Sequence, residues 1–436
     1  MRLSYPPAAS YYAASVASSA RLSVEGPRPH RETLRGEHRF DVVVLGGGIA
    51  GCSAALHLAQ RGYRVALLEA RVVGYGASGR SGGQTIFGLA ASQARLTAEV
   101  GREAARRLFE LSIEALDLTQ ALIGQYGIDC DYHANHVHVA VKPRHLDELQ
   151  EWARELHEDY HYTSARLLNR DELQQHVRSE RYLGGLLDSR SGHLHPLKYT
   201  QGVAHAAELA GAEIFENSPV LRYTDGAEVT VHTAHGSVRC AHLVLCGNAY
   251  LGAVAPSLAR RILGVGTYII ATEKLGEDRV RALLPSNAAI ADINWILDYF
   301  RRSADHRLLF GGRVSYSAVQ PPRLADSMRR RMLRIFPGLA GIKVAYSWGG
   351  FLDITMSRAP NFGRLASNVF YMQGFSGHGM SLTGLAGKLV AEAIAGTAER
   401  FDVFARIPHR DFPGGPLFRR PSLVMAMLYY RLRDLL

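Results

Sequence analysis

Cysteine is scarce in this chain of 436 residues. The four cysteines form no CxxC pair and show no spacing typical of a disulfide framework or a zinc site. They are Cys52, Cys130, Cys240 and Cys246. Secreted proteins often carry disulfide bonds. The lack of a disulfide pattern in this sequence therefore favours a reducing compartment, and we expect a cytoplasmic protein.

Long apolar runs are also missing. No stretch reaches the roughly 18 apolar residues that a membrane-spanning helix needs. Residues 1–38 are rich in Ala, Ser, Pro and Arg, and they contain no apolar core of signal-peptide length. We therefore expect a soluble protein without stable membrane insertion, and we interpret residues 1–38 as a partly mobile N-terminal tail.

Positive charge predominates, with a formal net charge of +10. Such an excess favours anionic ligands, and nucleic acid is one alternative. The arginines cluster at 329–331 with Arg334 and at 419–420, but no interleaved aromatic residues are present to stack on bases. We interpret these arginines as solvated surface residues and expect no nucleic-acid partner.

A complete βαβ unit opens the folded part of the sequence. Residues 40–45 form a β-branched run typical of a parallel strand that is buried on both faces. Three glycines then turn the chain into an alanine- and leucine-rich helix over 49–61, and residues 65–69 form the next strand.

The turn of this unit carries the pattern Gly46-x-Gly48-x-x-Gly51, and Glu69 follows about 20 residues later. Gly46 permits the tight turn, Gly48 lets the backbone approach a pyrophosphate, and Gly51 allows close packing of helix on strand. The helix N-terminus would face the phosphates, and Glu69 would accept the ribose hydroxyls. This unit predicts a cofactor with an ADP moiety but does not separate FAD from a nicotinamide cofactor.

Two later glycine-rich segments favour FAD. Residues 74–84 are too dense in small side chains and backbone donors for an ordinary loop, which indicates close approach of a ligand. Residues 374–380 join a strand over 369–374 to a helix that begins near Ser381. The N-terminus of that helix would face the flavin and stabilise the negative charge that develops on reduction.

The remaining chain alternates between two patterns. Residues 99–157 are mostly helical around one strand at 136–141, which indicates a separate α+β region. Residues 196–247 contain a helix followed by short strands, which indicates a return to the nucleotide-binding sheet. Residues 264–316 are again strand-rich, and a helix is predicted over 324–336.

Several short segments resemble the D-amino-acid oxidase and glycine/sarcosine oxidase superfamily of FAD-dependent oxidoreductases. These segments are residues 10–15, 76–80, 191–197, 247–252 and 412–415, so the resemblance spans nearly the whole chain. It implies oxidation of a small-molecule amine by dioxygen.

The resemblance also implies an α/β plus α+β fold. A Rossmann-type FAD-binding domain would be built from discontinuous segments, and a substrate domain would contain a larger, mostly antiparallel sheet. We assign the FAD-binding domain to residues 39–95, 186–255 and 340–410, the substrate domain to 96–185 and 256–339, and a C-terminal segment to 411–436.

The residues expected to bind FAD come from all of these segments. They are Gly46, Gly48, Ile49, Ala50, Gly51, Glu69, Ala70, Ser78, Arg80, Ser81, Gly82, Gly83, Gln84, Val220, Gly247, Gly374, Ser376, Gly377, His378, Gly379 and Met380. The resemblance places the Val220 backbone at the adenine, Gly247 near the ADP portion, and residues 374–380 around the isoalloxazine ring. Some relatives attach FAD through a cysteine in the C-terminal third, but no cysteine follows Cys246, so we expect non-covalent FAD.

Two departures from the simpler amino-acid oxidases bear on the substrate. Similar sarcosine oxidases carry a lysine soon after the later glycine segment and arginines soon after the early glycine pair, and these cations bind the substrate carboxylate. Here residues 380–382 and 85–89 contain no cation. A small α-amino acid would therefore bury a poorly paired carboxylate, at a cost of several kcal/mol. We expect instead a lone primary amine on an aliphatic chain. The resemblance implies that this amine belongs to γ-glutamylated putrescine, and that it is oxidised to an aldehyde with release of ammonia and hydrogen peroxide.

Two residues are candidates for catalytic roles. Arg313 matches the region where relatives place a cation near the flavin, and it would promote oxygen reduction; a surface arginine on a strand is the alternative. His378 would act electrostatically at the ring edge, and the alternative is a turn-stabilising role. We expect Trp348 to pack in the core, with lining of the pocket as the alternative.

Other histidines have simpler interpretations. His133, His136 and His138 have a metal-like spacing, but strand alternation places only His136 and His138 on one face, and no acidic or cysteine partner is obvious. No metal is therefore expected. His193 and His195 flank a helix start and would be structural or ligand-orienting.

Three other functions remain open at this point. One is another FAD-dependent amine or amino-acid oxidase or dehydrogenase of the same superfamily. The others are a flavoprotein that acts on tRNA, which the positive charge permits, and a flavin-binding protein without catalytic activity.

Overall fold

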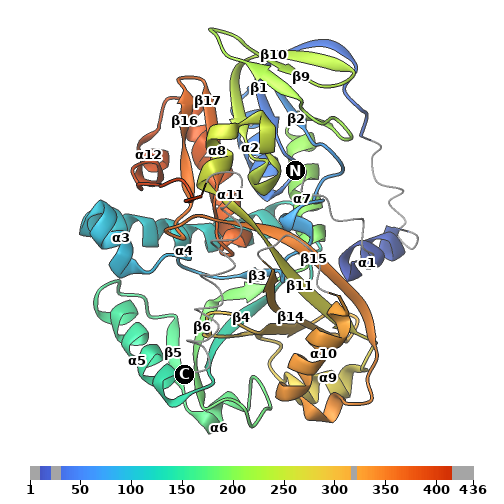
Figure 1. Ribbon diagram of the computed structural model, residues 1–436, viewed down its shortest axis with the longest axis vertical. Coiled ribbons are helices and arrows are strands. Elements are labelled where there is room, and N and C mark those ends of the chain that lie inside the picture. Colours follow the sequence, from blue (N-terminus) through green and yellow to red (C-terminus); the bar gives the residue numbers. More distant parts are fainter. Residues whose placement is uncertain (1–9, 21–30, 316–321, 415–436) are drawn as a thin grey trace.

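The computed structural model of the chain describes residues 10–20, 31–315 and 322–414. The strands in these ranges form one eight-stranded and one nine-stranded sheet. In Figure 1 the eight-stranded sheet occupies the upper part of the molecule and the nine-stranded sheet the lower part. The predicted architecture of an α/β part and an α+β part is confirmed.

The eight-stranded sheet has a parallel centre. Its strands run in the order β16 (Asn361–Ala366), β17 (Val369–Gln373), β10 (Gly236–Leu245), β1 (Gly36–Leu45), β2 (Val65–Leu68) and β7 (Glu213–Phe215), and β9 (Val229–His232) and β8 (Arg222–Thr224) extend it from β10. Val42, Val43 and Val44 of β1 are completely buried, as the predicted central strand requires. The segments are far apart in the sequence, so this sheet is discontinuous as predicted.

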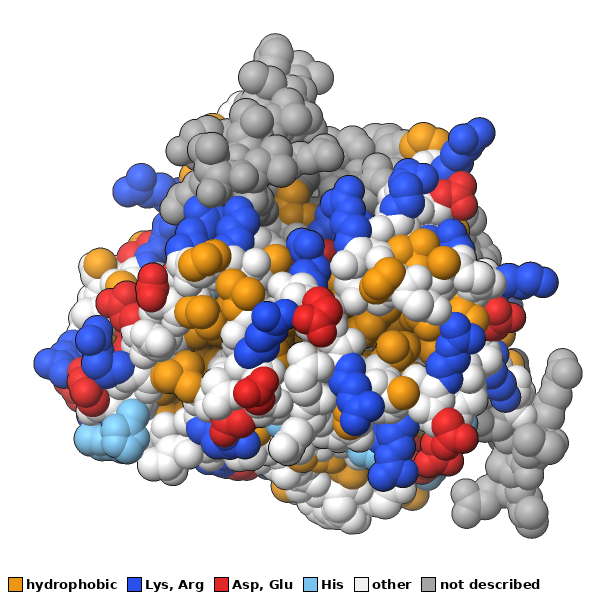
Figure 2. Space-filling model, turned by 90° about the horizontal axis from the view of Figure 1, so that it is seen from below, with side chains coloured by type: hydrophobic (Ala, Val, Ile, Leu, Met, Phe, Trp, Pro, Cys, Tyr) orange, Lys and Arg blue, Asp and Glu red, His pale blue; other side chains and the backbone are white. Residues whose placement is uncertain are grey.

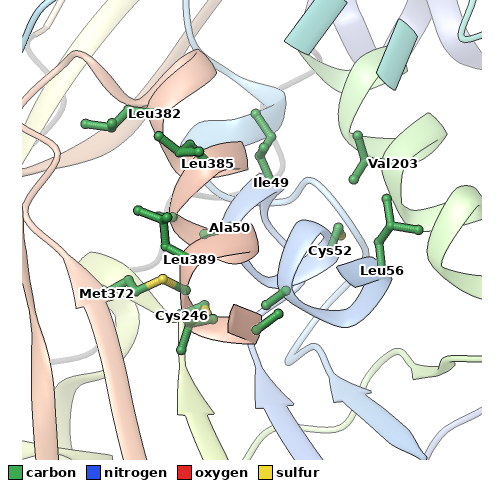
Figure 3. Close-up of a cluster of buried hydrophobic side chains, with 14 of the residues drawn as sticks. Ile49, Ala50, Cys52, Leu56, Val203, Cys246, Met372, Leu382, Leu385 and Leu389 are labelled. Carbon is green, nitrogen blue, oxygen red and sulfur yellow. The ribbon is translucent and has the colours of Figure 1, made fainter. Parts of the chain in front are cut away.

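Two helices pack closely against each other beside this sheet. α2 (Ile49–Ala59) and α11 (Gly379–Ile394) approach so closely that a Cβ atom at Gly387 would lie 2.5 Å from the Ala54 nitrogen. Figure 3 shows Leu56 of α2 and Leu389 of α11 in the buried cluster around them. This packing fixes the N-termini of both helices relative to each other.

The nine-stranded sheet is mostly antiparallel. Its strands run in the order β15 (Val344–Ile354), β11 (Leu263–Thr272), β14 (Leu308–Ser315), β13 (Tyr299–Arg302), β12 (Ala289–Asp292), β4 (His133–Ala140), β6 (Gly184–His193) and β3 (Gln84–Thr85), and β5 (Ala165–Leu168) pairs with β6. Among the described pairings of this sheet, only β12 and β4 are parallel.

The other helices lie around the two sheets (Figure 1). They are α1 (Tyr11–Ala20), α3 (Gln93–Val100), α4 (Arg102–Gln125), α5 (Pro143–Glu158), α6 (Arg170–Leu173), α7 (Pro196–Leu209), α8 (Pro256–Arg261), α9 (Glu277–Leu283), α10 (Leu324–Ile335) and α12 (Glu399–Ala405). The predicted helical region that begins at residue 99 is interrupted near its start. Gly101 adopts a φ of +86°, which ends α3 before α4 begins.

The first 38 residues differ from the expected tail. Residues 11–20 form the helix α1, in which Tyr12 is completely buried, and β1 begins at Gly36. The proposed domain division stays a prediction, and its boundary at residue 186 falls inside β6.

The charged surface is mixed. On the face in Figure 2, Lys and Arg side chains are spread among Asp, Glu and uncharged side chains. The interpretation of the first arginine cluster as solvated is wrong for Arg331, because its Nε donates to Asp298 Oδ1 at 2.7 Å. Arg419 and Arg420 lie outside the described residues. None of the helices in the described ranges is both long and apolar enough to cross a membrane.

Candidate active site

A cavity of about 380 Å³ is lined by strands of the nine-stranded sheet, by the N-terminal ends of α2 and α11, and by loops beside them. Many of the predicted cofactor residues line it, namely Ile49, Ser78, Arg80, Ser81, Gly82, Gly83, Gln84, Ser376, Gly377, His378, Gly379 and Met380. Two glycine-rich segments far apart in the sequence therefore meet at one cavity.

A second group of predicted residues surrounds the turn between β1 and α2 instead of the cavity. A Cβ atom at Gly46 would lie 2.9 Å from the Cys246 carbonyl oxygen, and one at Gly51 would lie 1.9 Å from the Gly46 carbonyl oxygen. Gly46 adopts a φ of +111°. The end of β10, which leads into Gly247, and the start of α2 thus approach this turn as only glycine permits. Ala50 belongs to the first turn of α2.

Glu69 lies directly beside the same turn. Its Oε2 accepts a hydrogen bond from the Gly47 N–H at 2.7 Å, and its Oε1 accepts one from the Arg71 N–H at 2.8 Å. Burial raises the pKa of the Glu69 carboxyl, and these backbone donors partly oppose that shift. The Ser218 N–H donates to the Glu69 carbonyl, which brings the segment before Val220 alongside. Ala70 is exposed.

Ser78 connects the first glycine-rich segment with the second. Its Oγ accepts a hydrogen bond from the Ile49 N–H at 3.0 Å, at the N-terminus of α2. A Cβ atom at Gly48 would lie 2.9 Å from the same oxygen. This is a narrow cradle of backbone donors, and such a cradle fits the diphosphate of a dinucleotide.

The third segment is held in unusual backbone conformations. Gly374, Ser376 and Gly377 all adopt positive φ values, of +78°, +54° and +100°. The side chain of Asp353 accepts a hydrogen bond from the Gly374 N–H, and its carbonyl oxygen accepts one from the Ser376 N–H at 3.0 Å. Local strain of this kind is typical of ligand-binding loops, where the surrounding structure maintains it.

The third segment ends at the N-terminus of α11. His378 is the residue before this helix, and the Ser81 hydroxyl donates to the Met380 sulfur at 3.0 Å, so the second and third segments are in contact. Burial, with a smaller effect of Arg358, lowers the pKa of His378 to about 4. Because His378 is neutral near pH 7, the positive potential beside it comes from Arg358 and from the positive end of the α11 dipole.

Two histidines missed as site residues line the cavity opposite these segments. His136 and His138 lie on one face of β4, with ring centroids 4.4 Å apart. Burial lowers the pKa of both, that of His138 to about 3, so both are neutral near pH 7. The Nδ1 atoms of both rings have no hydrogen-bond partner among the described residues. The alternation of the sequence predicted their shared face, but it did not indicate what that face covers.

The connection between β12 and β13 also lines the cavity and was missed. It contributes Asp292, Trp295, Leu297 and Tyr299. Burial raises the pKa of the Asp292 carboxyl to about 7. Trp295 is 44% exposed, so this connection reaches from the cavity to the surface. Nothing in its sequence marks it as part of a site.

The remaining candidates are placed as follows. Arg313 lies in β14, but its side chain is outside the described residues. Trp348 is completely buried and does not line the cavity; its Nε1 donates to the Arg80 carbonyl at 3.0 Å, so the packing interpretation is confirmed. His195 accepts from the Lys198 N–H as the cap of α7, and His193 contacts the Asn287 carbonyl. In the described ranges no three His, Cys, Asp or Glu side chains are grouped to hold a metal ion.

Comparison with known proteins gives consistent results. Residues 41–393 match the family described as FAD dependent oxidoreductase, abbreviated DAO. The chain is 42% identical over 426 residues to the gamma-glutamylputrescine oxidoreductase of Escherichia coli, and the match covers 98% of both chains. It is 24% identical to a glycine oxidase of Bacillus licheniformis, over 82% of this chain and 94% of that protein.

Solved structures share the fold. The glycine oxidase of Bacillus cereus superposes with a TM-score of 0.69 at 22% identity, and the match covers 85% of this chain and 99% of that one.

Proposed function

Since the chain belongs to the family of FAD dependent oxidoreductases, we propose that it oxidises the free primary amine of γ-glutamylputrescine. The amine, water and dioxygen would give the aldehyde, ammonia and hydrogen peroxide. The observation that carries this proposal is the likeness over nearly the whole chain to an enzyme named for that substrate. Four buried, unpaired cysteines support a cytoplasmic setting for the enzyme.

The three glycine-rich segments would hold FAD. The Gly46–Gly51 turn and Glu69 fit its ADP portion, and the cavity beside Gly82 and Gly377 fits its ring system. Bound there, FAD supplies the two-electron oxidation of the amine carbon, and dioxygen takes up the electrons. None of the described residues lining the cavity is a cysteine, which supports non-covalent binding.

The chain's own residues would prepare the amine. A neutral amine donates a hydride more readily than an ammonium ion, and a buried cavity disfavours the charged form. His136 and His138 are neutral near pH 7 and therefore offer acceptor nitrogens to an amine N–H. The N-terminus of α11 at Gly379 would stabilise the negative charge that develops during reduction.

The acyl group would be bound away from the flavin. Two arginines, Arg80 and Arg358, are among the described cavity-lining residues. The Arg80 guanidinium donates to the carbonyls of Tyr75 and Gly349, so it is occupied by the wall itself. The Arg358 guanidinium lies 5.4 Å from the ring centre of the half-exposed Trp295. We propose that Arg358 receives the carboxylate of the glutamyl group at the outer part of the cavity.

A peroxide-release assay tests this proposal. Purified enzyme would be offered γ-glutamylputrescine, acetylputrescine, putrescine, glycine, sarcosine and D-alanine, and the rates would be compared as kcat/KM. We expect γ-glutamylputrescine to be the best substrate and the three amino acids to be nearly inert. A preference for sarcosine or glycine would make the chain an amino-acid oxidase instead. Amine-dependent reduction of a dye without peroxide release would make it a dehydrogenase.

A further inference from the structure

The cavity wall at residues 80–83, here called the wall loop, is backed by unusually close backbone contacts. The Leu194 N–H donates to the Gly83 carbonyl at 2.8 Å. A Cβ atom at Gly83 would lie 2.1 Å from the Leu194 carbonyl oxygen and 3.1 Å from Arg301 Nη2. The wall loop therefore has a defined position only while the groups behind it stay in place.

Arg301 of β13 is the central group behind the wall loop. Its side chain is almost completely buried, and its Nε donates to the Gly82 carbonyl at 2.7 Å and its Nη2 to the Leu194 carbonyl at 2.9 Å. Among the described residues, no carboxylate lies within ion-pair distance of Arg301, whose described partners are carbonyls and a phenol. Burying a guanidinium without a carboxylate is unfavourable, which favours a functional role for the charge itself at this position.

The N-terminal helix α1 closes the space behind Arg301. Tyr12 is completely buried, and its hydroxyl accepts a hydrogen bond from Arg301 Nη2 at 3.2 Å. The Tyr12 ring also packs edge-on against Trp348, with ring centroids 5.2 Å apart. Since Trp348 donates to the Arg80 carbonyl, Tyr12 supports the wall loop at both of its ends.

Further contacts hold α1 in this position. The Ser15 hydroxyl hydrogen-bonds with His195 Nε2 at 2.9 Å, and the Tyr11 hydroxyl donates to Asp305 Oδ1 at 2.7 Å. Figure 1 shows α1 at the side of the molecule, and it precedes the residues that match the family, which begin at residue 41. It therefore lies outside the residues that the family model matches, and its buried Tyr12 contacts the groups behind the site.

We propose that α1 and Arg301 form a positioning unit for the flavin, with Tyr12 and Arg301 as its positioning residues. The unit fixes the backbone of the wall loop and places one buried positive charge directly behind it. The geometry supports FAD binding, and the charge favours the reduced, more negative state of the bound flavin. Both effects are independent of which amine is oxidised.

The affinity for FAD tests the geometric part. Apoprotein of each variant would be titrated with FAD, and binding followed by flavin fluorescence. Tyr12→Leu and Arg301→Met are expected to raise the Kd of FAD by about tenfold or more, and Tyr12→Phe by a smaller factor. The matched control is Ser18→Ala, which removes an exposed hydroxyl from the same helix that donates to the Ala14 carbonyl within α1, and its Kd should stay that of the wild type. If Tyr12→Leu does not fold, the Kd of FAD for Tyr12→Phe decides whether Tyr12 supports FAD binding.

The reduction potential of the bound flavin tests the proposed effect of the Arg301 charge. If Arg301 had only a structural role, its replacement would leave this potential unchanged. Arg301→Met should shift the midpoint potential of the bound flavin to more negative values. Arg301→Lys should keep the potential near that of the wild type while weakening FAD binding, because an ammonium group lacks the fork that holds two carbonyls. Folded Tyr12 and Arg301 variants with unchanged FAD affinity and unchanged potential would overturn the proposal. No substrate enters these measurements, so a failure of the substrate assignment is separate from a failure here.

Discussion

The cavity wall formed by the glycine-rich segments presents mainly backbone, whereas the wall formed by β4 and the β12–β13 connection presents side chains. On the first wall, Gly377 adopts a left-handed conformation, and at the adjoining turn a Cβ atom at Gly48 would collide with the cavity-lining Ser78. On the second, His138 and Trp295 reach the cavity from strands and loops of ordinary geometry. Function is thus divided between a wall that tolerates no added atoms and one whose side chains set the chemistry.

Adding a side chain at the turn that adjoins the first wall should have the largest effect. Gly48→Val places a β-branched side chain against Ser78 and in the path of the phosphates. We expect the affinity for FAD to fall by about 100-fold or more, which corresponds to about 3 kcal/mol. The loss of affinity is measured as the flavin content per purified chain. The control is Gly338→Val, where an added Cβ meets no atom within 4 Å, and normal FAD content in Gly48→Val would remove Gly48 from the site.

Removing the cation that lies beside the second wall, over the Trp295 ring, should change selectivity while FAD stays bound. Arg358→Met removes the group proposed to bind the glutamyl carboxylate, so kcat/KM for γ-glutamylputrescine should fall by about tenfold or more, as for loss of a charge-assisted hydrogen bond. The value for putrescine should hardly change. Arg330→Met, at an exposed position of α10, loses the same charge without contact to the cavity. A parallel loss with both substrates would contradict the role of Arg358.

Removing an acceptor near the amine should affect both substrates equally. His138→Leu is expected to lower kcat/KM for γ-glutamylputrescine and putrescine by a similar factor of about 5 to 10, since both present the same amine. His133→Leu is the matched control, because His133 lies on the same strand but is exposed and does not line the cavity. An effect confined to the acylated substrate would place His138 at the other end of the cavity.

The smallest expected effect concerns stability at the first wall. Burial raises the pKa of Asp353 from an ordinary 3.8 to about 7, so the folded protein keeps a proton there that the unfolded chain releases. The contribution of Asp353 to the free energy of unfolding is complete below about pH 4 and is lost as the pH rises to about 7. The free energy of unfolding then falls by at most about 1.4 kcal/mol per pH unit. Asp353→Asn should flatten this part of the pH dependence in apoprotein unfolding. An unchanged slope in the variant would show that Asp353 is ionised in the folded protein.

The contrast between the walls also explains what the sequence could predict. The turn at Gly46–Gly51 and the strand before it are local patterns, in which spacing alone determines the geometry. His136 and His138 were expected on one face, but which cavity they face depends on pairing between β4 and β12, which are distant in the sequence. The sequence therefore predicted which of these side chains share a face, but it did not predict that they line the cavity.

The N-terminal helix was missed for a related reason. Residues 11–20 are rich in Ala and Ser, and a composition of that kind is equally typical of a tail. The burial of Tyr12 depends on Trp348 and Arg301, which come more than halfway along the chain after it. Only the folded structure brings these three side chains together.

The most direct test of the whole account is anaerobic reduction of the enzyme-bound flavin, followed by the loss of its visible absorbance after rapid mixing with an amine. We expect γ-glutamylputrescine to bleach the flavin rapidly, putrescine to do so more slowly, and sarcosine and glycine to leave it oxidised. Rapid bleaching by sarcosine or glycine, with slow bleaching by γ-glutamylputrescine, would contradict the assignment of the side-chain wall to a long amine.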